Sequence, residues 1–161
     1  PFSAWDNIDV SVVNFSKRGM LHGVTSQGIH LLCTHLGLFE RERRLQISKL
    51  NSYMREKIPV DEPLILAGDF NDWRKTSHRF LLDQLGLQEA VELGRNKLAK
   101  TFPAIFPVLA MDRIYIRGFK VSGCRVMNSS KWRSLSDHCA VLADLTLTVS
   151  PQAELTSLTP L

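Results

Sequence analysis

The run from Leu64 to Asn71, LILAGDFN, decides the fold of this chain because it joins an apolar strand to a polar exit. Residues 63–67 are apolar throughout, which predicts a short strand buried on both faces of a sheet. Gly68 then allows a close backbone approach or unusual dihedral angles. Asp69 and Asn71 are two positions apart, so their side chains share one face if the exit is extended. Taken alone, the same residues also fit a turn closed by Asx hydrogen bonds.

Apolar periodicity on both sides of this run predicts an α/β chain with more strands than helices. Apolar alternation and apolar runs predict strands over residues 7–14, 20–25, 29–36, 63–67, 112–117, 120–126 and 138–149. Helical spacing predicts helices over 39–57 and 77–85, the second with Ser77 as its N-cap and Gly86 just past its end. We therefore expect one domain over residues 1–149 and a loose tail over 150–161.

Composition indicates a globular domain with a mild excess of positive charge. The 161 residues are 44% hydrophobic, which is enough for a real core. A net charge of +4 is consistent with an anionic partner, and it is equally consistent with a charge that only keeps the protein soluble. The cysteines, Cys33, Cys124 and Cys139, are isolated, which predicts reduced, buried thiols and a cytoplasmic setting. No apolar run approaches the roughly 18 residues of a membrane span.

A second polar motif, Ser136-Asp137-His138, precedes another apolar strand. A histidine with a pKa near neutrality can move a proton or carry charge, but it needs an orienting partner, and Asp112 is the candidate partner of His138. Asp112 could instead cap a loop or pair with Arg113. His35 closes the 29–36 strand, where a histidine is either structural or part of a site.

Trp73 and Arg74 extend the first motif to GDFNDWR. An exposed Trp-Arg pair can stack on a base or sugar, and core packing is an equally good reading. Arg43 and Gln46 are expected to hold the 39–57 helix against the site loops.

Four short motifs resemble the endonuclease/exonuclease/phosphatase family, the DNase I-like metal-dependent phosphodiesterases. They are Thr34-His35-Leu36-Gly37, Gly68-Asp69-Phe70-Asn71, Met111-Asp112-Arg113-Ile114-Tyr115 and Ser136-Asp137-His138. The resemblance spans about Trp5 to Leu147 and looks closest to an uncharacterised bacterial branch. It implies a four-layer α/β/β/α sandwich, of which this chain would supply the carboxyl-terminal part without the amino-terminal strands.

The same resemblance implies a phosphoesterase that uses Mg²⁺ or Mn²⁺. In the family, the aspartate matching Asp69 orients the attacking water and the asparagine matching Asn71 contacts the phosphate. The histidine matching His138 contacts the phosphate in the transition state. The implied catalytic residues are His35, Asp69, Asn71, Asp112 and His138, and the implied metal ligands are Asp69 and Asp137.

A complete family member also carries an upstream glutamate as its principal metal ligand, and no such context precedes Trp5. We therefore expect impaired activity, and the alternative is a non-catalytic anion-binding or interaction module with the same fold. The substrate could be nucleic acid, an inositol phosphate or a phospholipid head group, because fold does not fix function. An opened sheet would expose apolar residues such as Ile65, Val141 and Leu145, which predicts self-association.

Overall fold

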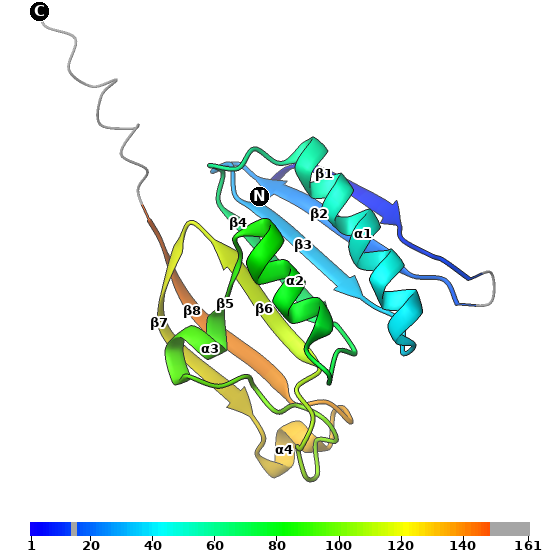
Figure 1. Cartoon of the computed structure of the whole chain (residues 1–161). Coiled ribbons are helices and arrows are strands. Elements are labelled where there is room, and N and C mark those ends of the chain that lie inside the picture. The colour runs from blue at the N-terminus through cyan, green and yellow to red at the C-terminus, as the bar shows by residue number, and fades with distance from the viewer. Residues whose placement is uncertain (14–15, 149–161) are drawn as a thin grey trace, which may run out of the picture.

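The computed structural model describes residues 1–13 and 16–148, so the tail expected at 150–161 lies outside the described residues. A mixed six-stranded sheet forms its centre, with the strand order β1-β2-β3-β4-β6-β5 (Figure 1). The strands of this sheet are β1 (Phe2–Asp9), β2 (Gly19–Thr25), β3 (His30–His35), β4 (Leu64–Asp69), β5 (Gln88–Glu89) and β6 (Asp112–Arg117). A second sheet pairs β7 (Phe119–Met127) with β8 (Ala140–Leu147), and the helices are α1 (Glu40–Lys57), α2 (Thr76–Leu85), α3 (Ala90–Arg95) and α4 (Ser130–Arg133).

Helices α1 and α2 cover one face of the large sheet (Figure 1). Helical spacing brings Ile47, Leu50 and Met54 of α1 onto this face, where they are buried with Leu64 and Leu66 of β4. Each such side chain contributes about 1.5–3 kcal/mol when fully buried. The predicted apolar stripe of α1 is therefore confirmed. None of the described helices is long and apolar enough to cross a membrane.

The opposite face of the large sheet is covered only in part. Phe119 of β7 forms a second small core with Ala90 and Ile116, and Ile65 and Leu145 pack against it. β4 is therefore buried on the side of α1 and α2, at Leu64 and Leu66, whereas Ile65 and Ala67 on the other side are only half-buried. The expected burial of this strand on both faces is complete on one face only. This arrangement confirms a mixed α/β fold.

The other half of this face, over β1 to β3, is an apolar groove. Its volume is about 550 Å³, and Phe2, Trp5, Leu21 and Cys33 are among its lining residues. The solvent-facing apolar surface is thus real, and its position agrees only in part with the expectation. Ile65 is half-buried and lines this groove, whereas Val141 and Leu145 do not line it. Trp5 and Leu21, which are exposed, line it as well.

Cys33 is exposed in this groove, so the expectation that it is a buried thiol is wrong. The apolar run around it predicted burial, but alternation along β3 points Cys33 to the uncovered face. Cys139 is buried, and all three cysteines are free thiols.

Two element boundaries differ from the sequence expectation. The first strand ends at Asp9 instead of continuing to residue 14, because the Asp9 side chain accepts a hydrogen bond from the backbone N–H of Ser11 and turns the chain. Helix α2 begins at Thr76, and Ser77 lies inside it and makes no capping hydrogen bond. Asp72 replaces it: its two carboxylate oxygens accept the backbone N–H groups of Thr76 and His78.

A chain of hydrogen bonds crosses the sheet through two buried histidines. Tyr53 of α1 lies 2.9 Å from His22 Nδ1, His22 Nε2 lies 2.8 Å from His30 Nδ1, and His30 Nε2 contacts Glu62. One direction of donation satisfies every group: from the Tyr53 hydroxyl through both neutral imidazoles to the Glu62 carboxylate. Protonating both histidines would place two N–H donors opposite each other, so the chain tolerates at most one imidazolium.

We expect His22 to make the fold acid-sensitive. Burial, and then the charge of His30, lowers its pKa, so the unfolded chain takes up a proton at a higher pH than the native chain. The stabilisation is complete above the unfolded pKa of about 6.5 and is lost as pH falls through the lower folded pKa. Urea unfolding at pH 7.5 and at pH 5.0 measures this loss.

The matched comparison is His22→Gln, which keeps a polar side chain that does not titrate. Its free energy of unfolding should depend less steeply on pH than that of the wild type in this window. Identical pH dependence in the two proteins would mean that His22 carries none of the effect.

Candidate active site

Strand register brings the polar side chains of three strands to one end of the large sheet. β3 and β4 are parallel and place His35 opposite Asp69. β4 and β6 are antiparallel and place Asp69 opposite Asp112. The carboxyl ends of β3 and β4 therefore meet the start of β6 at the same edge (Figure 1).

Gly68 is required at this edge. A Cβ atom added to it would lie 1.8 Å from the backbone carbonyl oxygen of Thr34, and its φ of +145° is one that side-chain-bearing residues rarely adopt. The two strands can approach this closely only because position 68 has no side chain. The close approach predicted from the sequence is thus present.

His138 and Asp112 form a hydrogen-bonded pair. The distance from His138 Nδ1 to Asp112 Oδ2 is 2.7 Å, so Nδ1–H donates to the carboxylate and Nε2 is left as the free nitrogen. The ring of Phe102 lies 4.9 Å from the imidazole, centroid to centroid, and restricts its orientation. This is the pairing expected from the sequence, and Arg113 instead turns to Asp72.

The protonation of His138 reflects two opposing influences. Burial disfavours the imidazolium, whereas the hydrogen bond to Asp112 and the charges of Asp112, Asp69 and Asp137 favour it, and the sum raises the pKa of His138. The protonated, donating form of Nε2 is therefore more populated near neutral pH than in a free histidine.

His35 forms a second pair with Asp69. Its Nε2 lies 3.5 Å from Asp69 Oδ2, and its Nδ1 lies 3.4 Å from an Arg18 guanidinium nitrogen. Since guanidinium only donates, Nδ1 accepts and the proton of neutral His35 sits on Nε2, toward Asp69. His35 is exposed, so both nitrogen contacts lie at the surface of the site.

Asn71 lies differently from the sequence expectation. Its φ of +49° turns the backbone, so Asp69 and Asn71 do not share a face by strand alternation. Asn71 is buried, its Nδ2 donates to the carbonyl of Leu36, and its backbone N–H donates to Asp69 Oδ1. In this geometry Asn71 anchors the loop and fixes the Asp69 carboxylate, while Asp137 is exposed beside His138.

A buried ion pair holds the loop after Asp69, and sequence reasoning missed it. Asp72 and Arg113 are both fully buried, with 3.9 Å between Oδ2 and NH1, and Arg113 NH2 donates to the Asp72 carbonyl at 2.7 Å. The sequence feature that could have indicated the role of Asp72 is its position four residues before Thr76, the first residue of α2. Arg18 was also missed, because nothing in its local sequence predicts the contact with His35.

Helix α1 holds the loop after β3, as expected from the sequence. The Gln46 side-chain oxygen accepts the backbone N–H of Gly37 at 2.8 Å, and Arg43 donates to the Gly37 carbonyl at 3.2 Å. Arg43 also lies over the Trp73 ring, 5.0 Å from its centroid. Trp73 and Arg74 are both exposed, so the core-packing interpretation of this pair is wrong.

The paired histidine and aspartate open onto a small cleft. It measures about 290 Å³ and is lined by residues from β4, β6 and the start of β8, including Gly68, Asp112, Ser136 and His138. Among the described residues, no three His, Cys, Asp or Glu side chains gather as a metal-binding group. The charges of Asp69 and Asp137 both favour the imidazolium of His138. One or two carboxylates suffice for Mg²⁺ when phosphate and water supply the other ligands.

No family model matches this chain. The uncharacterised protein YbhP of Escherichia coli K12 is 39% identical over 152 residues, which cover 91% of this chain and 60% of that protein. The chain therefore spans about three fifths of the length of these curated relatives.

Solved structures share the fold at lower identity. An endonuclease/exonuclease/phosphatase family protein of Bacteroides thetaiotaomicron is 18% identical with a TM-score of 0.72, covering 92% of this chain and 66% of that one. A mannosyl-6-phosphatase of the same organism is 19% identical with a TM-score of 0.70, covering 91% of this chain and 67% of that one. The fold is thus one used by phosphatases and by the endonuclease/exonuclease/phosphatase proteins.

The Asp112 carboxylate should control the pKa of His138. We expect Asp112→Asn to lower that pKa, because the amide keeps a hydrogen-bonding oxygen but removes the negative charge that stabilises the imidazolium. Histidine ring resonances followed by NMR across pH 5 to 9 measure the change without any need for activity.

Asp144→Asn, on the far part of β8, is the matched control and should leave the His138 titration unchanged. A titration of His138 that is the same in Asp112→Asn and in the wild type would contradict the pairing.

Proposed function

We propose that this chain carries the phosphate-binding and proton-transfer groups of a metal-dependent phosphoesterase. The observation that carries the proposal is the side-by-side placement of two carboxylate–imidazole pairs, His138 with Asp112 and His35 with Asp69, at one sheet edge. The phosphatases and endonuclease/exonuclease/phosphatase proteins that share the fold support it.

Each group has a chemical role that follows from its contacts. Asp112 holds Nδ1–H of His138, so Nε2 is directed away from Asp112, and its proton can be donated to a phosphoryl oxygen. The raised pKa of His138 keeps that proton in place near neutral pH. His35 can turn its Nε2–H from Asp69, 3.5 Å away, to a second phosphoryl oxygen when a phosphate enters the site.

Asp69 serves the attacking water. Its Oδ1 already accepts the backbone N–H of Asn71, so Oδ2 remains to accept a proton from water and to align it for in-line attack on phosphorus. His35 Nε2 lies 3.5 Å from this Oδ2, so the imidazole stands beside the place where the water would bind. Asn71 supports the reaction by holding Asp69.

Mg²⁺ or Mn²⁺ is the cofactor that we propose, with Asp69 and Asp137 as its protein ligands. When bound, such an ion polarises the phosphoryl oxygens and lowers the pKa of water. Two carboxylates hold it weakly, so millimolar metal and a bound phosphate are needed to complete the site. We infer low intrinsic turnover for the 161-residue chain for this reason.

The substrate that we propose is a phosphate ester, since every donor in the cleft is suited to phosphoryl oxygens. The class includes nucleic acid, inositol phosphates and phospholipid head groups. The cleft of about 290 Å³ admits one phosphate and the atoms next to it. Its volume does not distinguish nucleic acid from an inositol phosphate or a phospholipid head group.

Hydrolysis of bis(p-nitrophenyl) phosphate and p-nitrophenyl phosphate tests the proposal. With 10 mM Mg²⁺ or Mn²⁺ we expect slow turnover that EDTA abolishes. His138→Gln should lower the rate by about 100-fold, the usual contribution of a positioned proton donor. Lys57→Gln, at the distant end of α1, should leave the rate unchanged.

The second candidate function is a non-catalytic phosphate-binding module, and the lack of a third metal ligand among the described residues favours it. Phosphate binding measured by calorimetry, lost in His138→Gln but unaccompanied by hydrolysis, would establish this alternative. Neither hydrolysis nor phosphate binding would overturn both functions.

We further infer that the chain self-associates through the apolar groove over β1 to β3. Trp5 and Leu21 are exposed there, and β1 is an edge strand with unpaired backbone groups. Sedimentation equilibrium should show a dimer that Leu21→Glu shifts toward monomer, while Leu93→Glu, on the exposed side of α3, has no effect. A wild-type monomer at high protein concentration would contradict the inference.

A further inference from the structure

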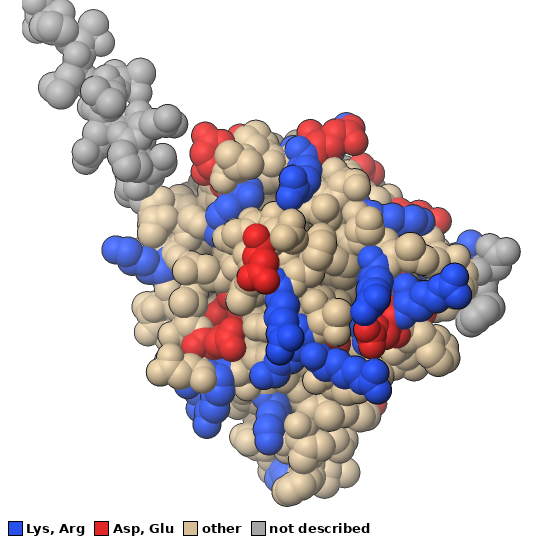
Figure 2. All heavy atoms as spheres, in the orientation of Figure 1, with Lys and Arg blue, Asp and Glu red and all other residues tan. Residues whose placement is uncertain are grey.

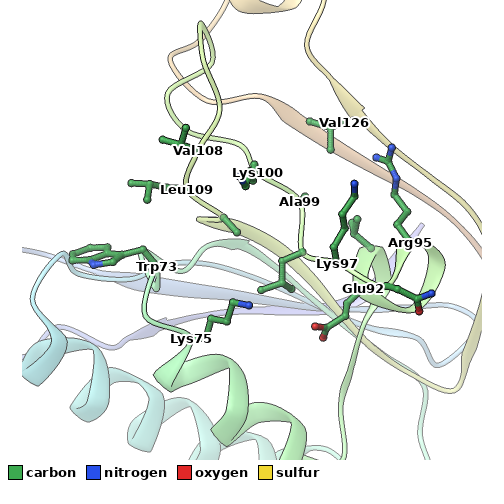
Figure 3. A pocket seen from close by; sticks show the side chains of 14 residues that line it. Trp73, Lys75, Glu92, Arg95, Lys97, Ala99, Lys100, Val108, Leu109 and Val126 are labelled. Atoms are coloured by element: carbon green, nitrogen blue, oxygen red, sulfur yellow. The ribbon is translucent and has the colours of Figure 1, made fainter.

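A cavity of about 620 Å³ opens beside α3 and the segment ahead of α2 (Figure 3). Its walls come from Trp73 and Lys75 ahead of α2, from α3 and residues 96–100 after it, from residues 108–110, and from Val126 of β7. Nothing in the proposed phosphoesterase chemistry uses this space. Its volume lies within the range of small-molecule sites in proteins.

The charge around this cavity is strongly positive. Four cationic side chains line it: Lys75, Arg95, Lys97 and Lys100. None of the four lies within ion-pair distance of a carboxylate in residues 1–13 and 16–148, as the ion pairs found there involve other groups. Figure 2 shows Lys and Arg side chains gathered in the middle of this same face of the molecule.

One carboxylate, Glu92, also lines the cavity, but it has a partner. Its Oε2 lies 3.1 Å from Nε2 of the buried His78. One carboxylate against four cations offsets only part of the positive charge, and the cavity favours an anion with more than one negative charge.

Trp73 adds a flat apolar surface at one end of the cavity (Figure 3). The guanidinium of Arg43 lies over the indole, 5.0 Å from the ring centroid, and fixes its orientation. The ring is still 42% exposed, so it retains area on which another ring can stack. Val108 and Leu109 lie beside it and extend the apolar wall.

The cavity and the catalytic cleft have no lining residue in common. Asp112 reaches His138 on one face, whereas Arg113 and Tyr115 point to the helix side, where they contact Asp72 and His78. The two sites share no charged lining residue.

We propose that this cavity binds a free nucleotide, with the base stacked on Trp73 and the phosphates held by Lys97, Lys100 and Arg95. A nucleotide combines the two features that the walls select, a flat ring and a multiply charged anion. An anion without a ring would leave the indole unused, and a ring without phosphates would leave four cations without a partner. The site lies outside the proposed reaction, so it stands or falls independently of it.

Calorimetric titration of the wild-type chain with ADP in EDTA tests the proposal, since EDTA prevents any metal-dependent hydrolysis. We expect saturable binding, weakened at least about tenfold in the double variant K97Q/K100Q and by a similar factor in Trp73→Leu. Adenosine and inorganic pyrophosphate should each bind at least about tenfold more weakly than ADP, because each supplies one of the two features.

Two controls locate the binding. Trp132→Leu and Lys57→Gln change the same residue types away from the cavity and should leave the affinity for ADP unchanged. His138→Gln should also leave it unchanged, and ADP binding that depends on His138 but not on Lys97 and Lys100 would place the nucleotide in the catalytic cleft and overturn the proposal. Pyrophosphate binding as tight as ADP binding, or the absence of ADP binding, would overturn it as well.

Discussion

The contact between Gly68 and Thr34 is the constraint on which the rest of this structure depends. A side chain at position 68 would place a Cβ atom 1.8 Å from the Thr34 carbonyl oxygen, so only glycine lets β3 and β4 stay paired to their ends. This pairing sets His35 beside Asp69, and the antiparallel partner β6 sets Asp112 on the other side. One missing side chain therefore fixes the spacing of every polar group at the sheet edge.

The loops beyond that edge are held by buried polar contacts. Asp72 satisfies two backbone N–H groups at the start of α2 and faces the buried Arg113, so the loop cannot move without exposing a charge to an apolar environment. Gln46 and Arg43 hold the loop after β3 in the same way. These contacts hold the loops that surround the Asp69 carboxylate. In flexible loops the carboxylate would take several orientations.

The protein has two electrostatic environments. In one, the carboxylates of Asp112, Asp69 and Asp137 surround His138 and favour its protonated form. In the other, beside α3, Lys and Arg residues surround a cavity whose single carboxylate is paired with His78. The two environments share no lining residue.

The sequence by itself determined β2, β3, β4, β6, β7 and β8 and the apolar stripe of α1, because these depend on periodicity, and it offered Asp112 as one candidate partner of His138. It did not predict β5, α3 or α4, which are short. Only the tertiary structure decided the rest. Asn71 is buried and anchors its loop because its φ is positive. Asp72 caps α2 in place of Ser77, and Arg18, which lies between β1 and β2, contacts His35 at the end of β3. Each of these contacts either joins residues that are distant in the sequence or depends on a backbone dihedral angle. The local order of polar and apolar residues predicts neither of these. The cationic cavity is the clearest case, since its walls come from separate segments that only folding brings together.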